Sequence, residues 1–172
     1  MDLITSIVRM ALIAAPLYAA NGSAVIFSGR TPLDLNSKFV DGREVFGKGK
    51  TFRGTFFGII TGIIVTLIIA NFFFNETLLL TKHYVFYGIL VSVGAIFGDL
   101  TGSFLKRRMG LKRGAPVIIL DQFDFLFVGI LFGAFYALPS IEEFIALAAI
   151  TLIAHKLSNM IAFKFKLKKV PW

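Results

Sequence analysis

Three acidic side chains stand out in this sequence because they flank a cluster of bases within otherwise apolar segments. Asp99, Asp121 and Asp124 fall in segments predicted to cross a membrane, where an ionised group is costly and usually functional. The bases occupy residues 106–113, between Asp99 and Asp121. Mg²⁺ takes oxygen ligands and is commonly held by one or two carboxylates together with substrate phosphates. The pattern therefore predicts a site for a phosphorylated substrate and for Mg²⁺, with two ions shared among the three acids.

The three acids are expected at one depth in the membrane. Asp99 lies seven residues before Lys106, which at 1.5 Å per residue places it about 10 Å below the end of its helix. Asp121 and Asp124 fall in the first turns of the next helix, after Pro116, a residue suited to a helix start. Their spacing of three residues puts both on one helix face. The acids thus form one layer near the basic side of the membrane.

The helix that carries Asp99 has a polar stripe and a run of small residues. The stripe consists of Asp99, Gly102, Ser103 and Lys106. Glycines at positions 94, 98 and 102 allow a neighbouring helix to come close. The sequence therefore predicts a polar pocket that opens towards the basic side.

A second phosphate signal lies in the first polar connector, where residues 41–54 contain four glycines. Glycine lets backbone N–H groups approach an anion closely, and neighbouring bases neutralise it. The spacing is not that of a Walker A loop. An anionic lipid contact, or a loop without a ligand, would explain the same composition. The candidate phosphate contacts are Arg43, Lys48, Lys50, Thr51 and Arg53.

The composition is that of an integral membrane protein. Of 172 residues, 56% are hydrophobic and 20 are Phe, and the mean hydropathy is +0.80. Runs of about 20 apolar residues cross a hydrocarbon core about 30 Å thick, and an open sheet cannot do so. A single all-α transmembrane catalytic domain is expected over residues 1–172. Its five transmembrane helices are predicted at residues 3–27, 54–74, 84–105, 117–138 and 143–163.

Lysine and arginine are concentrated in the connectors at residues 28–53 and 106–116 and in the C-terminal tail. Because cytoplasmic segments collect these residues, the N-terminus is predicted outside and the C-terminus inside a multi-pass protein of the cell membrane. The candidate site would then face the cytoplasm. This topology explains the net charge of +8 without nucleic acid as a partner. The sequence has no cysteine, which excludes disulfides and thiolate metal sites, and its apolar surface would also allow a homo-oligomer.

Each charged group also has an explanation without a ligand. The basic connectors could serve membrane topology alone. The acids could form buried ion pairs, Asp99 with Lys106 or Arg107, and Asp121 and Asp124 with Lys156. Polar residues in the first and last helices could line a pocket or only pack helices together; they are Asn21, Ser23, His155, Lys156, Ser158 and Asn159. Three acids at one depth exceed what helix packing requires, which favours the ligand site.

The segment from Ser103 to Asp124 resembles the signature of the phosphatidate cytidylyltransferases, integral membrane enzymes that make CDP-activated lipids. That signature is S-x-x-K-R, four residues, K-D, and then D-R-x-D. Two flanking motifs of the family also have counterparts, as Gly98-Asp99-Leu100 and as Lys50-Thr51-Phe52-Arg53-Gly54. Within the signature the matching residues are Ser103, Lys106, Arg107, Lys112, Asp121 and Asp124.

The sequence also departs from that signature. Arg113 replaces an Asp, Gln122 replaces an Arg and Arg53 replaces a Glu, while the family's intervening H-G-G stretch is missing. The linker and the whole chain are shorter than in bacterial or eukaryotic members. A small five-span protein with this abbreviated signature is similar to the archaeal branch of the family, the CDP-archaeol synthases.

This resemblance implies an Mg²⁺-dependent nucleotidyltransferase of phospholipid biosynthesis. The substrates would be CTP and an isoprenoid ether-lipid phosphate, 2,3-bis-O-(geranylgeranyl)-sn-glycerol 1-phosphate, with pyrophosphate leaving. Two Mg²⁺ ions would be held by Asp99, Asp121 and Asp124. Lys106 would act with these acids in catalysis, and the other signature residues, Ser103, Arg107 and Lys112, would bind substrate. The connector residues Lys48, Lys50, Thr51 and Arg53 would close over the triphosphate, with Arg43 as a further substrate contact.

Other functions would use some of the same residues. A cation- or proton-coupled transporter would place its acids at an ion site near the bilayer centre and would need no long basic connectors. A CDP-alcohol phosphotransferase would carry the longer motif D-G-x-x-A-R…G-x-x-x-D-x-x-x-D, of which Asp41-Gly42-Arg43 is only a fragment. A related CDP-lipid enzyme could act on a different lipid phosphate.

Overall fold

The computed structural model describes residues 2–111 and 117–164, and the regular secondary structure of these residues is helical. Strand pairing in the described part is limited to isolated bridges between Pro32 and Thr51 and between Lys38 and Glu44. The prediction of an all-α fold is confirmed. The helices are α1 (Leu3–Ile26), α2 (Phe52–Phe72), α3 (Phe74–Thr77), α4 (Tyr84–Arg108), α5 (Ile118–Gly133) and α6 (Ile141–Lys164).

Among the described residues, α1, α2 and α4 are long and apolar enough to cross a membrane. A shorter apolar stretch, Phe123–Gly133, belongs to α5. The span expected at 117–138 extends too far, because α5 ends at Gly133. Residues 134–138 are apolar but lie outside the helix. They precede Pro139, and a proline disfavours helical backbone conformation in the residue before it. Hydropathy alone therefore overestimates the length of this helix.

The predicted loop at 106–116 begins too early, because α4 continues through Lys106, Arg107 and Arg108. Basic side chains in a last helical turn interact favourably with the helix dipole. Arg43 from the first connector also donates to the backbone oxygens of Arg107, at 3.3 Å, and of Arg108. α2 likewise begins at Phe52, two residues earlier than expected, with Thr51 as its N-cap. Helix ends are set by capping contacts, whereas the prediction placed them where the apolar run stopped.

Glycines bring α4 and α5 into close contact, as the sequence predicted for positions 94, 98 and 102. A Cβ atom at Gly94 would lie 2.8 Å from Cβ of Phe132, and one at Gly98 would overlap the backbone oxygen of Asp124. At Gly102 a Cβ atom would overlap the carboxylate of Asp124. This spacing of four residues keeps one glycine face of α4 against α5. The close approach brings Asp124 next to the turn of α4 that carries Asp99.

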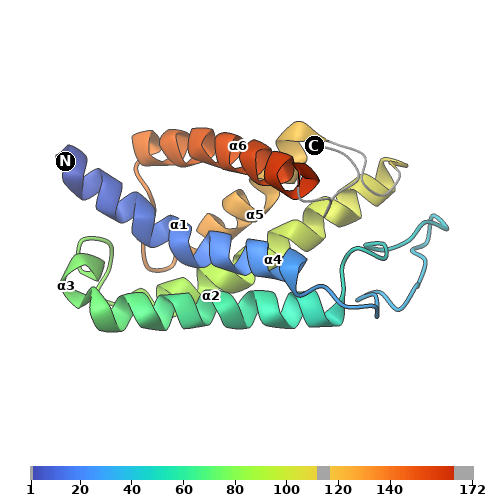
Figure 1. The fold of residues 1–172 in the computed structure, drawn as a ribbon, viewed down its shortest axis with the longest axis horizontal. Helices are drawn as coiled ribbons and strands as arrows, with labels where there is room; N and C mark the ends of the chain where they lie inside the picture. Colours follow the sequence, from blue (N-terminus) through green and yellow to red (C-terminus); the bar gives the residue numbers. More distant parts are fainter. Residues whose placement is uncertain (1, 112–116, 165–172) are drawn as a thin grey trace.

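The connector between α1 and α2 lies at one end of the molecule, near the C-terminal end of α4, as Figure 1 shows. The N-terminus and α3 lie at the opposite end (Figure 1). We call the first of these the basic end, formed by residues 27–51 and by the last turn of α4. The two basic regions that the sequence analysis treated separately are therefore neighbours in space.

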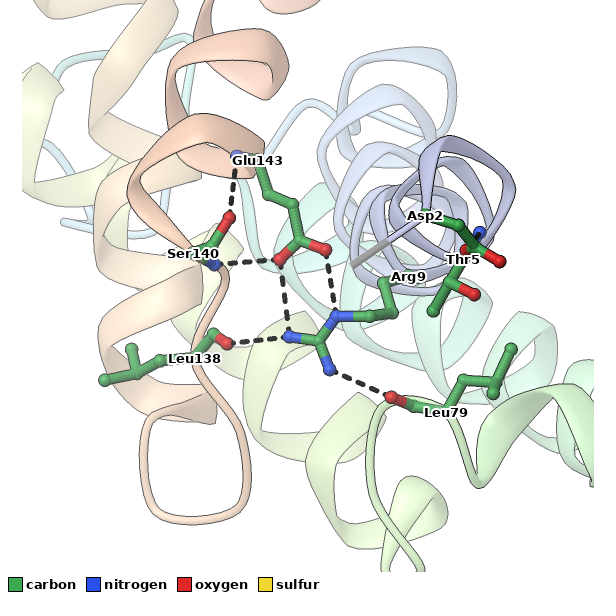
Figure 2. A network of polar contacts seen from close by, with 7 residues as sticks. All are labelled: Asp2, Thr5, Arg9, Leu79, Leu138, Ser140 and Glu143. Atoms are coloured by element: carbon green, nitrogen blue, oxygen red, sulfur yellow. Dashed lines mark hydrogen bonds and ion pairs between the residues drawn. The ribbon is translucent and has the colours of Figure 1, made fainter.

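At the opposite end, a buried ion pair joins α1 to α6 (Figure 2). Nε of Arg9 lies 2.9 Å from Oε1 of Glu143, whose side chain is only 2% exposed. The two terminal nitrogens of Arg9 donate to the backbone oxygens of Leu79, at 2.9 Å, and Leu138, at 3.1 Å. Glu143 also accepts the backbone N–H of Ser140, at 2.8 Å, and its own N–H donates to the Ser140 hydroxyl, as in a capping box. One arginine thus ties four segments together at the start of α6.

Replacing Arg9 with Ala is expected to lower the free energy of unfolding by about 2 kcal/mol, because the buried Glu143 carboxylate loses its charged partner. The measurement is thermal unfolding of the purified protein in detergent. A double variant, Arg9→Met with Glu143→Gln, removes both charges and should recover part of the loss. Equal stability of Arg9→Ala and the unmodified protein would contradict a stabilising role for the pair.

Candidate active site

The candidate residues of the connector and of α4 meet in an ion pair at the basic end. Nζ of Lys50 lies 2.5 Å from Oδ2 of Asp99, although the two residues are 49 positions apart in sequence. Each side chain is 23% exposed, so solvent and small ions reach the pair. Lys50 immediately precedes the N-cap of α2, and Asp99 lies nine residues before the end of α4. The pair therefore links the N-terminal end of α2 to the C-terminal half of α4.

A pocket of about 170 Å³ adjoins the Lys50–Asp99 pair. Val25 and Ser28 line it from the end of α1, and Thr55 lines it from the first turn of α2. Ile96 and Leu100 of α4 complete an apolar wall. The pocket is thus polar beside the Lys50–Asp99 pair and apolar where the side chains of Val25, Ile96 and Leu100 line it. Of the residues in the predicted α4 stripe, Asp99 lines this pocket, whereas Gly102 faces Asp124 of α5.

Thr51 fixes the backbone next to Lys50, where the connector enters α2. Its hydroxyl oxygen accepts the N–H of Gly29, at 2.9 Å, and the N–H of Gly54, at 3.1 Å. The N–H of Leu33 donates to the backbone oxygen of Lys50 at 2.7 Å. Gly54 also packs so closely on α1 that a Cβ atom there would lie 2.6 Å from the backbone oxygen of Ala24. The role of Thr51 visible in the structure is structural, because its oxygen is already used by two backbone donors.

Asp34 organises the remainder of the connector. Its carboxylate accepts the N–H groups of Phe46, at 2.9 Å, Gly47, at 2.8 Å, and Asn36, at 3.1 Å. Burial alone would raise the pKa of Asp34, but these N–H donors hold it below the ordinary value of 3.8. Gly47, with a φ of +87°, begins the turn that leads to Lys50, whose N–H donates to the Gly47 oxygen at 3.1 Å. Asp34 therefore shapes the segment that presents Lys50.

This pKa shift predicts a pH-dependent effect of replacing Asp34 with Ala. A lowered folded-state pKa means that Asp34 contributes stability above the unfolded value of about 3.8, and that this contribution disappears as the pH falls through the folded pKa. We expect the variant to be about 2 kcal/mol less stable at pH 6, and this difference to shrink as the pH falls below about 3.8. Thermal unfolding in detergent across this range measures the difference. A gap that stays constant down to pH 3 would contradict the role of the ionised carboxylate.

Arg108 attaches the connector to the end of α4. Its guanidinium carbon lies 4.7 Å from the ring centres of both Phe39 and Phe104, which are themselves in edge contact. The guanidinium also donates to the backbone oxygen of Glu44 at 2.5 Å and lies 3.2 Å from the carboxylate of Asp41. Together with the contacts of Arg43 described above, this fixes the connector over the last turn of α4. Arg43 is thus observed as a helix-capping residue.

Asp124 completes the group of acids that the described residues bring together. Its Oδ1 accepts the N–H of Phe125 at 2.6 Å, and its carboxylate occupies the space left by the missing side chain of Gly102. Asp124 lies within electrostatic range of Asp99, Lys50 and Lys106. The structure therefore places two predicted acids and two predicted bases in one cluster across α4, α5 and the connector.

The other predicted residues divide into buried and exposed groups. Ser103 and Arg107 are buried on α4, and Nε of Arg107 has no hydrogen-bond partner among the described residues. A buried guanidinium N–H needs an acceptor, and phosphate oxygen is one that arginine binds well. Lys48 and Arg53 are exposed at the basic end. Lys112 lies outside the described residues, as does the side chain of Asp121.

Two expectations about polar contacts are corrected. Asp99 was expected to pair with Lys106 or Arg107 if its role were structural, but its ion pair is with Lys50. This contact could not be predicted from the sequence, because the two residues are far apart along the chain. Lys50 belongs to a connector whose path is set by Asp34 and Thr51. Ser23 was a candidate pocket wall, but its hydroxyl donates back to the backbone oxygens of Ala19, at 2.6 Å, and Ala20, at 3.2 Å.

Four further residues, Ser28, Thr55, Asp34 and Arg108, were not among the predicted site residues. Thr55 follows Thr51 by one helical turn, which was the signal for a shared face. Asp34 carried a weaker signal, as an acid in a basic connector, since side chains of Asp commonly bond backbone N–H groups in turns. Ser28 had no such signal, because its place depends on how α1 packs against α2.

The oxygen donors of the cluster suit a hard divalent cation. Asp99 and Asp124 offer carboxylates and no sulfur or imidazole ligand, which is the chemistry that Mg²⁺ prefers. The space at Gly102 holds the Asp124 carboxylate where any larger residue would displace it. Among the residues described, no group of three acids or histidines forms a complete metal cluster. Asp121 therefore stays a prediction as the third ligand.

Comparison with known proteins assigns the chain to a family. A CDP-archaeol synthase of Methanocaldococcus jannaschii is 43% identical over 166 residues, covering 91% of this chain and 92% of the relative. That of Pyrococcus abyssi is 42% identical over 159 residues, covering 91% and 93%. A solved structure described as an intramembrane enzyme for archaeal membrane lipid biosynthesis matches with a TM-score of 0.77 and 31% identity, over 87% of this chain and 91% of that one. The family profile named CarS-like, CDP-archaeol synthase, matches residues 1–172, and the chain belongs to this family.

Proposed function

We propose that the chain transfers the cytidylyl group of CTP to 2,3-bis-O-(geranylgeranyl)-sn-glycerol 1-phosphate, which yields a CDP-activated archaeal lipid and pyrophosphate. The observation that carries this proposal is the cluster of Lys50, Asp99 and Asp124, together with the buried Arg107 eight residues after Asp99 on α4. The relatives named CDP-archaeol synthase support the reaction class. We also propose five membrane spans, with the N-terminus outside and the cluster facing the cytoplasm, as the basic connectors predict.

In this reaction an oxygen of the lipid phosphate attacks the α-phosphorus of CTP. The new P–O bond forms while the bond from the α-phosphorus to the bridging oxygen breaks, and pyrophosphate leaves with that electron pair. A phosphate dianion is already a nucleophile near neutral pH, so no general base is needed. The main difficulty is the repulsion between two polyanions. Catalysis then consists of positioning and charge neutralisation.

The chain's own residues supply most of this neutralisation. Lys50 and Lys106 both lie within electrostatic range of Asp124, and Nε of Arg107 has no hydrogen-bond partner among the described residues, which leaves it available for a phosphate oxygen. Asp99 and Asp124, with Asp121, would hold Mg²⁺, which when bound would offset phosphate charge and favour departure of pyrophosphate. Lys48 and Arg53 are exposed at the basic end, available to a nucleotide that enters from that side. Thr51 supports the site through the backbone.

The proposal is tested with purified protein in detergent and CTP labelled at the α-phosphate. We expect Mg²⁺-dependent transfer of label to the archaeal ether-lipid phosphate, and much less with ATP, GTP or UTP. Diacyl phosphatidate serves as the comparison lipid. Equal use of all four nucleotides would refute the cytidylyl assignment, and transfer to phosphatidate alone would refute the lipid assignment.

A further inference from the structure

We propose that the pocket between α1, α2 and α4 is the subsite for the phosphate and glycerol of the lipid substrate, so that the lipid and the nucleotide approach Asp99 from opposite sides. This inference rests on the proposed function and specifies it. It gives Lys50 the lipid phosphate as a ligand, instead of the triphosphate that the family resemblance suggested. The pocket is the 170 Å³ space beside the Lys50–Asp99 pair.

The polar groups of the pocket suit a phosphate monoester. Lys50 provides a charged donor, and its ammonium group is reachable because the side chain is 23% exposed. The hydroxyls of Ser28 and Thr55 line the same space and make no hydrogen bond with any other described residue. Hydrogen bonds from a charged donor and from hydroxyls to phosphate oxygens are among the stronger polar contacts. Two hydroxyls and the ammonium group of Lys50, which pairs with Asp99 in this structure, therefore line one space.

The pocket is small compared with sites that enclose a whole nucleotide. Sites for drug-sized ligands occupy about 300–1,000 Å³, larger than the 170 Å³ available here. A cavity of this size can hold a small polar headgroup, such as a phosphate with part of a glycerol. The triphosphate then requires another position, and the buried Arg107, whose Nε has no hydrogen-bond partner among the described residues, offers a contact for it where the end of α4 meets Gly47 of the connector.

The rim of the pocket carries exposed apolar side chains. Val25 lines the pocket and is 65% exposed, and the neighbouring Ile26 is 76% exposed. Both lie in the last turn of α1, next to the connector, where a membrane helix meets the interface. A lipid keeps its phosphate at the interface and its chains in the hydrocarbon. The headgroup can therefore enter past Val25 while the isoprenoid chains stay in the bilayer against the exposed end of α1.

The pocket and the acid cluster meet at Asp99. Asp99 forms the wall shared by the pocket and the acid cluster, because its carboxylate contacts Lys50 on one side and lies in electrostatic range of Asp124 on the other. Gly98 and Gly102, on either side of Asp99 in sequence, face Asp124. A lipid phosphate in the pocket would therefore reach an α-phosphorus held near Asp124 across Asp99.

The experiment separates the two substrates by steady-state kinetics with Thr55→Leu, which fills the pocket, and Thr55→Val, which removes only the hydroxyl. We expect the KM for the lipid phosphate to rise about tenfold or more in Thr55→Leu and about threefold in Thr55→Val, with the KM for CTP unchanged within about twofold. The matched control is Thr101→Leu on α4, whose hydroxyl bonds the Phe97 oxygen outside the pocket. This control should leave both KM values unchanged.

A soluble probe tests the headgroup directly. In the unmodified protein, sn-glycerol 1-phosphate should inhibit competitively against the lipid and not against CTP, while inorganic phosphate should inhibit more weakly. Thr55→Leu should lose this inhibition. A rise in the KM for CTP, or no change in either KM, would overturn the inference while leaving the proposed function intact. Absence of labelled lipid from the unmodified protein would instead refute the proposed function. If Thr55→Leu does not fold, Thr55→Val and the probe decide the question.

Discussion

Replacing Asp99 or Asp124 with Asn is expected to lower the rate of CDP-lipid formation by about 10²-fold or more, with the fold retained. The change removes one negative charge and keeps the shape of the side chain. It therefore weakens the oxygen donor set while leaving the glycine packing of α4 on α5 in place. Losses of this size are typical when a preorganised charged group is removed from a site of charge transfer. The measurement is transfer of α-labelled CTP at saturating substrates and varied Mg²⁺.

The control for these variants is Glu76→Gln, an equally conservative change on the exposed α3 at the opposite end of the molecule. It should leave the rate unchanged. The Asp99→Asn and Asp124→Asn losses should also be less than additive in the double variant, because both acids serve one cluster. Full activity in both single variants would remove the acid cluster from the mechanism. Asp121→Asn belongs in the same series, as the test of the predicted third ligand.

A pair of glycine variants on α4 is expected to separate the fold from the chemistry. Gly98→Ala should cost about 3 kcal/mol or more of stability, because a Cβ atom there overlaps the backbone of α5 at Asp124, which cannot move without the helix. Gly102→Ala should cost much less stability, because its Cβ atom overlaps only the end of the Asp124 side chain. That carboxylate can rotate away, but it then leaves the position beside Asp99. Activity in Gly102→Ala should therefore fall about tenfold or more.

Thermal unfolding and labelled-CTP transfer, measured on both variants, distinguish these effects. Gly22→Ala is the control, because a Cβ atom at Gly22 meets nothing within 4 Å. We expect Gly22→Ala to be the most stable of the three variants, Gly102→Ala to be less stable, and Gly98→Ala to be the least stable. An active Gly102→Ala protein would show that the present position of the Asp124 carboxylate is unimportant for the reaction.

Much of the helical framework was predictable because hydrocarbon imposes a simple rule on sequence. A backbone buried in lipid must bond to itself, so long apolar runs become helices, and the runs at α1, α2 and α4 were located to within a few residues. The ends of helices were less predictable. Thr51 extends α2 and Arg43 caps α4 through contacts that hydropathy does not contain. α5 ends at Gly133, although the apolar sequence continues to Leu138 and suggested a longer helix.

The sequence by itself determined the chemistry available to this protein. It placed Asp99 and Asp124 in apolar helices, added the bases of two connectors, and spaced the glycines of α4 for close packing, because helix periodicity fixes which side chains share a face. Only the tertiary structure decided which groups meet. Lys50 reaches Asp99 because Asp34 and Thr51 fold the connector back over the helices, and Asp124 reaches the cluster because glycines let α5 approach α4. Contacts between residues tens of positions apart depend on packing and loop paths, which local sequence patterns do not encode.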